Sequence, residues 1–166
     1  MKPKIIFRKA TISDAVKIKK TIDAYAEEGI MLFRPLYEIY GSIRDFFIVE
    51  KGKKVIGCCA LHVLGEEYRP GRQGSILAEV RSLAVLKKEH GKGIGTQLVK
   101  ACINEAEAME IDKLFTLTTK KNVAFFKKIG FKEISTAKLP QKIWQECINC
   151  SRFPADCNEV SLIKDI

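Results

Sequence analysis

The chain has 166 residues, of which 46% are hydrophobic and 30% charged, and this is the composition of one globular domain of ordinary size. That composition excludes a disordered or collagen-like chain, and no apolar run approaches the roughly 20 residues that a membrane-spanning helix needs. Because the N-terminus reaches a charge too soon for a signal peptide, we expect a soluble, cytoplasmic protein. The net charge of +9 favours an anionic partner, but the lysines are scattered, and this argues against nucleic acid.

The first third of the chain predicts a strand, two helices and two further strands. After a strand at 5–8, Ser13 or Asp14 can cap a helix by accepting a hydrogen bond from a free N–H. That helix ends near Gly29, and a shorter helix follows Pro35. The apolar face of the first helix consists of Ala15, Ile18, Ile22 and Tyr25. Residues 46–50 and 55–64 predict two strands joined by a tight turn, and their nearly continuous apolar run predicts burial on both faces.

The rest of the chain predicts strands that alternate with helices. A loop at 65–74 precedes a strand at 75–85, in which Glu79, Arg81, Leu83 and Val85 share one face by simple alternation. A glycine-rich turn then opens a long helix that ends near residue 108. A strand at 114–118, a helix at 123–129, a strand from 131 and a last strand at 159–163 complete the order. The expected fold class is α/β, an α+β mixed sheet with helices on both faces.

The turn His90-Gly91-Lys92-Gly93-Ile94-Gly95 is the first candidate binding site. Glycines let the backbone turn tightly, and the free N–H groups and dipole of a helix start attract a diphosphate. The spacing differs from that of a nucleotide triphosphate loop and from the dinucleotide G-x-G-x-x-G. Taken alone, this pattern is weak, because glycines also simply end strands and start helices.

Three segments together resemble the GNAT acyl-CoA N-acetyltransferases. Residues 80–85 are similar to that family's central bulged strand, and 125–131 to its (F/Y)-Y-x-K-x-G-F segment. The glycine turn resembles the family's (Q/R)-x-x-G-x-(G/A), with His90 where Arg or Gln is usual. The resemblance covers essentially the whole chain and implies the GNAT fold, with acetyl-CoA as cosubstrate. It implies cofactor binding by Leu83, Ala84, Val85, His90, Gly91, Lys92, Gly93, Ile94, Gly95, Thr96, Asn122 and Phe126.

A closer resemblance is to the acetyltransferase domain of N-acetylglutamate synthase. It rests on residues 26–34, Cys58-Cys59-Ala60-Leu61, the Lys113–Thr119 string and Leu139-Pro140. It implies L-glutamate as the acceptor and a place in arginine biosynthesis. The amino-acid-kinase domain of the long form is missing, so we expect a short stand-alone form. We expect 1–166 to be a single domain, with a cysteine-containing C-terminal segment at about 140–158.

Acetyl transfer needs a neutral amine, and Glu79 is the candidate general base. The alternative for Glu79 is a structural ion pair with Arg81. A main-chain N–H near Val85 is the natural oxyanion donor. Phe126 stands where many relatives have a tyrosine acid, so the acid step is unassigned.

The two carboxylates of an acidic amino acid call for guanidinium or ammonium groups. Arg34, Arg81 and Lys120 are the candidates, although Arg34 and Lys120 could equally be solvated surface residues.

Of the six cysteines, Cys58, Cys59 and Cys102 read as small buried hydrophobes. Cys147, Cys150 and Cys157 are half of a zinc or iron–sulfur pattern without an evident fourth ligand, and a redox pair or plain thiols are the alternatives.

The expected partners are therefore acetyl-CoA and L-glutamate, with no nucleic acid or membrane, and the homo-oligomeric state stays open. Two other functions remain: transfer to another amine (another amino acid, a polyamine or a protein lysine), and a non-catalytic acetyl-CoA sensor.

Overall fold

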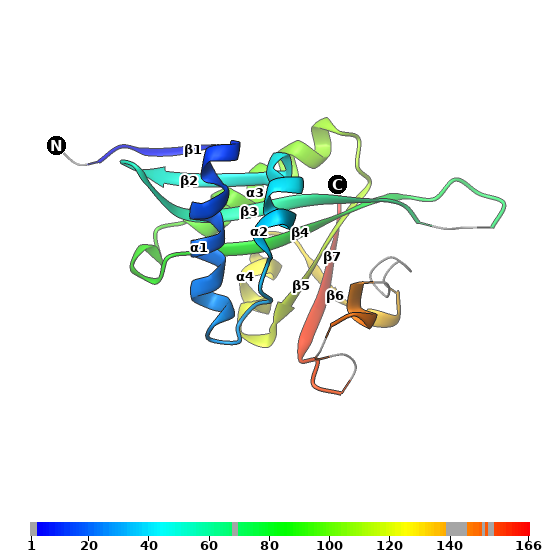
Figure 1. The fold of residues 1–166 in the computed structure, drawn as a ribbon. Helices are drawn as coiled ribbons and strands as arrows, with labels where there is room; N and C mark the ends of the chain where they lie inside the picture. The colour runs from blue at the N-terminus through cyan, green and yellow to red at the C-terminus, as the bar shows by residue number, and fades with distance from the viewer. Residues whose placement is uncertain (1–2, 68–69, 139–145, 151, 153–154) are drawn as a thin grey trace. The chain divides into compact units, whose positions relative to one another are not determined.

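The computed structural model describes residues 3–67, 70–138, 146–150, 152 and 155–166. Over these residues the strands form one seven-stranded mixed sheet in the order β1-β2-β3-β4-β5-β7-β6 (Figure 1). The strands are β1 (Ile5–Lys9), β2 (Phe46–Lys51), β3 (Lys54–Glu66), β4 (Ile76–Val85), β5 (Lys113–Thr119), β6 (Lys132–Ile134) and β7 (Glu159–Asp165). The α-helices are α1 (Ala15–Ala26), α2 (Leu36–Gly41), α3 (Ile94–Ala108) and α4 (Val123–Lys128). This confirms the predicted element order and fold class.

The chain forms two compact units, each described here by itself. The first consists of residues 1–62 and 80–105, and the second of residues 63–79 and 106–166. In the first unit, α1 and α2 cross one face of the sheet (Figure 1). Buried side chains of both helices pack there against the sheet residues Ile48, Cys58 and Ala60. The periodic apolar positions of α1 and the continuous apolar run of β3 therefore form one core, as predicted.

Helix α3 covers the opposite face of β3 in the first unit. A Cβ built at Gly57 would lie 3.2 Å from Leu98 Cδ1 and 3.3 Å from Ile94 Cγ2, and Cys59 Sγ lies 3.7 Å from Cys102 Sγ. Since Gly57 and Cys59 alternate with the residues that face α1, helices cover both faces of this strand. Cys58, Cys59 and Cys102 are fully buried, as predicted.

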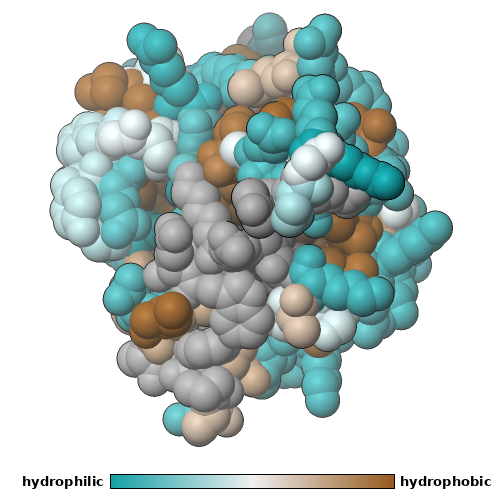
Figure 2. Space-filling model, turned by 90° about the vertical axis from the view of Figure 1, so that its right-hand side faces the viewer, coloured by the Kyte–Doolittle hydropathy of each residue, from teal (hydrophilic) through white to brown (hydrophobic). Residues whose placement is uncertain are grey.

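On the face shown in Figure 2, hydrophilic residues predominate around smaller apolar areas. No helix among the described residues is long and apolar enough to cross a membrane.

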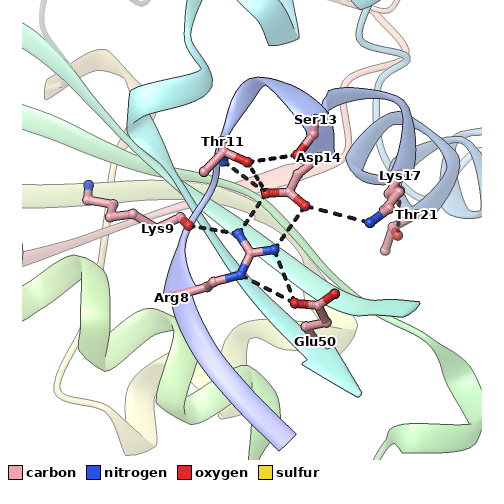
Figure 3. A network of polar contacts seen from close by, with 8 residues as sticks. All are labelled: Arg8, Lys9, Thr11, Ser13, Asp14, Lys17, Thr21 and Glu50. Carbon is pink, nitrogen blue, oxygen red and sulfur yellow. Dashed lines mark hydrogen bonds and ion pairs between the residues drawn. The ribbon is translucent and has the colours of Figure 1, made fainter. Parts of the chain in front are cut away.

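A buried ion-pair network fixes the entry to α1 (Figure 3). Asp14, which is 0% exposed, accepts hydrogen bonds from Arg8 at 2.7 and 3.0 Å and from the Thr11 N–H at 2.9 Å. Arg8 also reaches Glu50 on β2 at 3.1 Å. The sequence predicts that Ser13 or Asp14 caps α1, but Asp14, the residue before α1, makes no side-chain cap hydrogen bond to it. Thr11 and Asp14 instead form a capping box at the start of the 3₁₀ helix Ile12–Asp14, which leads into α1.

In the second unit, strands β5, β7 and β6 pair antiparallel, and residues 77–79 of β4 pair parallel with residues 113–115 of β5. Phe115 is fully buried, and partly buried apolar side chains, among them Leu117, Ile163 and Cys147, pack against it.

One local prediction about β4 is wrong. Ser82 has a φ of +55°, a left-handed conformation that interrupts the pleat in the manner of a bulge. Simple alternation therefore cannot place Glu79 and Arg81 on the same face as Leu83 and Val85. The carbonyls of Arg81 and Ser82 accept weak hydrogen bonds from the thiols of Cys59 and Cys58, at 3.7 and 3.6 Å.

Candidate active site

The glycine turn of the first unit has the geometry of an anion site. Gly91 and Gly93 both have a φ of +76°, a conformation that residues with a side chain rarely adopt. Both are exposed, and a Cβ built on either would meet nothing within 4 Å. The carbonyl of Gly93, the residue directly before α3, accepts a hydrogen bond from the Gln97 N–H at 3.0 Å. An open turn that leads into a 15-residue helix fits a diphosphate, because the first N–H groups of the helix point at it.

A buried carboxylate anchors this turn. Glu89, 4% exposed, accepts hydrogen bonds from Lys92 at 2.8 Å and from Lys51 on β2 at 3.0 Å. The hydrogen bonds from Lys92 and Lys51 lower the pKa of the Glu89 carboxyl to about 2. Lys92, a predicted cofactor residue, therefore has its ammonium group paired within the protein. The attraction that the turn offers an anion comes chiefly from its main-chain N–H groups.

The end of β4 leads directly into this region. Ala84 is buried, and its carbonyl lies 3.3 Å from the Cβ position of Gly57, while Leu83 and Val85 are half-buried. The Val85 carbonyl accepts hydrogen bonds from Tyr25 and from His90, the latter at 2.7 Å. These predicted cofactor residues, 83–85 and 90–96, thus lie on one continuous stretch of the first unit. Ile94 is buried under the turn, whereas Gly95 and Thr96 are partly exposed at the helix start.

The predicted arginines also belong to the first unit. Arg34, half-buried just before α2, has its Nη1 3.5 Å from Glu38 Oε2. Arg81 is half-buried on β4 beside the bulge at Ser82.

The second unit holds the other predicted side chains. Glu79 lies on β4, opposite Phe115 of β5, and is 8% exposed. Lys120 and Asn122 are exposed in the short 3₁₀ helix before α4. Phe126 is 3% exposed, and its ring packs edge-on against Phe125 and Phe131. Its predicted contact with the cofactor stays a prediction, and its ring offers no proton to a leaving group.

The terminal cysteines lie in the second unit, where Cys147 and Cys150 are partly exposed and Cys157 is exposed. Cys147 packs against the Phe115 cluster, and the Cys150 N–H donates to the Cys147 carbonyl at 2.9 Å. Burial raises the pKa of the Cys147 thiol. No group of three His, Cys, Asp or Glu residues that could hold a metal occurs in the described parts of the chain. Leu139 and Pro140 lie outside the described residues.

Three residues of this site were not singled out as functional in the sequence. Tyr25 was expected only as part of the apolar face of a helix, and Glu89 and Gly57 carried no signal. Each contacts a residue far away along the chain. Tyr25 and Val85 are 60 residues apart, Glu89 and Lys51 are 38 apart, and Gly57 and Leu98 are 41 apart. The one available signal was the position of Tyr25 at the end of the apolar face of its helix, where a buried tyrosine ring usually finds a hydrogen-bond partner for its hydroxyl.

Comparisons with known proteins agree on one family. A family model described as the acetyltransferase (GNAT) domain matches residues 42–133. The chain is 40% identical over 159 residues to an uncharacterized N-acetyltransferase of Chlorobaculum tepidum, which covers 96% of this chain and 95% of that protein. It is 31% identical over 163 residues to an amino-acid acetyltransferase of Mycobacterium tuberculosis, which covers 96% of this chain and 87% of that protein.

Two solved structures are similar over almost the whole chain. The N-acetylglutamate synthase of Neisseria gonorrhoeae, complexed with coenzyme A and N-acetyl-glutamate, has a TM-score of 0.80 at 25% identity. That match covers 99% of this chain but only 36% of the longer synthase chain. A Mycobacterium tuberculosis protein in complex with CoA has a TM-score of 0.77 at 26% identity, with 97% of this chain and 99% of that chain covered.

Proposed function

Because the chain belongs to the GNAT acetyltransferase family and uses acetyl-CoA as cosubstrate, we propose that it acetylates the α-amino group of L-glutamate. The observation that carries this proposal is the likeness to a synthase complexed with N-acetyl-glutamate, together with 31% identity to an amino-acid acetyltransferase. Such a reaction would serve arginine biosynthesis.

The diphosphate of acetyl-CoA would bind at Gly91 and Gly93, whose open, left-handed turn has the required exposed main chain. The pantetheine arm would follow the last residues of β4, Leu83 to Val85. If the pantetheine arm follows this strand, its thioester would lie near the bulge at Ser82. An N–H of the interrupted strand would then stabilise the oxyanion of the tetrahedral intermediate.

Glu79 is the proposed general base. An α-amino group has a pKa near 8, so removing its proton at pH 7 costs about 1.4 kcal/mol or more. In the proposed step the proton passes to Glu79, the amine nitrogen bonds to the thioester carbon, and the C–S bond breaks to release the CoA thiolate. A thiolate leaves without an acid because its pKa is near 8.5, and this fits the phenylalanine at position 126.

The role of Glu79 can be tested by Glu79→Gln, which keeps the size and polarity of the side chain. We expect kcat to fall by about 100-fold or more, with little change in the KM for acetyl-CoA, because general-base catalysis contributes this much. The measurement is steady-state thiol release, with the melting temperature as a check on folding. A kcat within about threefold of the original would remove Glu79 from the chemistry.

Arg34 is, with Arg81, a leading candidate to bind a substrate carboxylate, since the ion pair described for its guanidinium, with Glu38, is long at 3.5 Å. Arg34→Ala is expected to raise the KM for glutamate about 10-fold or more, and the KM for acetyl-CoA less than twofold. Arg44→Ala is the matched control, because Arg44 is an exposed arginine in the 3₁₀ helix before β2. Equal changes in both KM values would exclude Arg34 from the glutamate site.

The acceptor itself is tested by incubating the protein with acetyl-CoA and a panel of amines. The panel contains glutamate, other amino acids, a polyamine and a lysine peptide, and product is identified by mass. Acetylated glutamate as the main product supports the proposal. Product with every amine except glutamate would contradict it and favour another acceptor, whereas no product with any amine would favour an acetyl-CoA sensor.

A further inference from the structure

The last peptide group of β4 is held at both of its ends. Its carbonyl, on Val85, accepts a hydrogen bond from the Tyr25 hydroxyl and another from His90 Nε2 at 2.7 Å. Its N–H, on Leu86, donates to the Ile56 carbonyl of β3 at 2.9 Å. This peptide therefore cannot turn to meet a ligand without breaking bonds on two sides.

The protons in this cluster can be assigned from its hydrogen bonds. A carbonyl only accepts, so Tyr25 must donate its hydroxyl hydrogen and His90 must carry a hydrogen on Nε2. Tyr25 Oη and His90 Nε2 are themselves 2.8 Å apart, so the histidine can share its hydrogen between the carbonyl and the tyrosine oxygen. The two rings are nearly parallel, with an angle of 8° and centroids 6.4 Å apart.

Tyr25 reaches this cluster from the far end of α1. Its ring packs at the edge of the apolar core formed by α1, α2 and the sheet, and its hydroxyl extends beyond that core to the strand end. His90 stands directly before the glycine turn. Two charged residues just before His90 are paired, Lys87 with Glu28 and Glu89 with Lys51 and Lys92.

We propose that Tyr25 and His90 are positioning residues for acetyl-CoA. By fixing the Val85–Leu86 peptide they align the strand that holds the pantetheine arm with the turn that holds the diphosphate. This inference rests on the placement of acetyl-CoA in the proposed function. It also changes the expected role of His90, from a contact with the phosphate to a contact with the protein main chain.

The first test is Tyr25→Phe, which removes the hydroxyl and keeps the ring. We expect the Kd for CoA and the KM for acetyl-CoA to rise about 3- to 10-fold, the range for one lost hydrogen bond, with kcat and the KM for the amine changed less than twofold. Tyr37→Phe is the control, because Tyr37 is 73% exposed on α2 and should leave every constant unchanged. An unchanged Kd for CoA in Tyr25→Phe would overturn the proposal.

The second test separates positioning from phosphate contact, and it serves also if Tyr25→Phe fails to fold. His90→Ala is compared with His90→Gln, which retains an N–H donor, using acetyl-CoA and acetyl-pantetheine, which has no diphosphate. Positioning predicts that His90→Ala lowers kcat/KM about 3- to 10-fold for both thioesters and that His90→Gln restores most of it. A loss with acetyl-CoA alone would show a direct phosphate contact and overturn the proposal.

These outcomes are independent of the acceptor. CoA affinity is measured by calorimetry without any amine, so a wrong assignment of glutamate changes only the product of the amine panel. An unchanged CoA affinity in the tyrosine variant would in turn leave the glutamate proposal intact.

Discussion

Asp14 shows how a single buried charge can be tolerated at the start of a helix. The Arg8 guanidinium beside it, and then the N–H and hydroxyl of Thr11, hold the pKa of the Asp14 carboxyl at about 2. The same contact raises the pKa of Arg8 above its usual value. Because the carboxylate is more stable in the folded chain than in the unfolded one, its ionised form stabilises the fold.

Asp14→Asn should therefore destabilise the protein at pH 7 by about 2 kcal/mol or more. The lowered pKa of Asp14 means that this stabilisation is complete above the unfolded pKa of about 3.8 and is lost as the pH falls toward 2. The difference in the free energy of unfolding between the variant and the original protein, measured by urea unfolding, should therefore shrink from pH 5 to pH 2.

Asp23→Asn is the control for this series, since Asp23 forms an i, i+4 pair with Lys19 on the helix surface. Its effect should stay below about 0.5 kcal/mol. If the loss in free energy of unfolding caused by Asp14→Asn did not change with pH, the charge of Asp14 would not be the source of the stabilisation.

At the scale of the element, the packing of α3 on β3 decides where the glycine turn lies. The first turn of α3 lies against Gly57, because a methyl group there would come within 3.3 Å of Ile94 and of the Ala84 carbonyl. The Ile94 side chain can shift slightly to make room for this methyl group, but the main-chain carbonyl of Ala84 on β4 cannot. Gly57 thus sets the distance between the sheet and the helix start at which the diphosphate is proposed to bind.

Gly57→Ala should displace the start of α3 and raise the Kd for CoA about 10-fold, with a loss of stability of about 1–3 kcal/mol. Gly41→Ala is the matched control, since a Cβ at Gly41 meets nothing within 4 Å and the residue ends α2. That variant should bind CoA normally. Normal CoA binding by Gly57→Ala would mean that the helix start adjusts without consequence for the site.

At the scale of the whole molecule, the net charge of +9 attracts the anionic phosphates of acetyl-CoA. We expect the KM for acetyl-CoA to rise roughly 3- to 10-fold between low salt and 0.5 M salt, because screening weakens long-range attraction. The kcat/KM for acetyl-pantetheine, which lacks phosphates, should change little over the same range. Equal salt effects on both thioesters would mean that charge plays no part in cofactor binding.

The element order and the glycine turn could be predicted because both are written in local sequence: apolar periodicity, and glycines between a strand and a helix. The resemblance of residues 80–85 to a bulged strand predicted an irregularity there, but its position at Ser82 could not be predicted from the residue type, since a serine has no intrinsic preference for a positive φ. The hydrogen bond of Tyr25 to Val85 was equally out of reach, because it joins residues 60 apart. The turn that is proposed to bind acetyl-CoA could thus be predicted from the sequence, while the contacts that hold it required the structure.

The rate at which the thiols between β3 and α3 react with an alkylating reagent measures how often this part of the fold opens. Cys59 and Cys102 are buried there with their Sγ atoms 3.7 Å apart, whereas Cys58, whose pKa burial raises to about 12, lies in the core on the α1 side of β3. An alkylating reagent can reach Cys59 and Cys102 only when α3 separates from β3, whereas Cys147 and Cys150 are partly exposed and Cys157 is exposed in the folded chain. If coenzyme A binds at the start of α3, a saturating concentration of it should slow the labelling of Cys102. The labelling rates of Cys147, Cys150 and Cys157 should not change, and peptide mass spectrometry over time measures both.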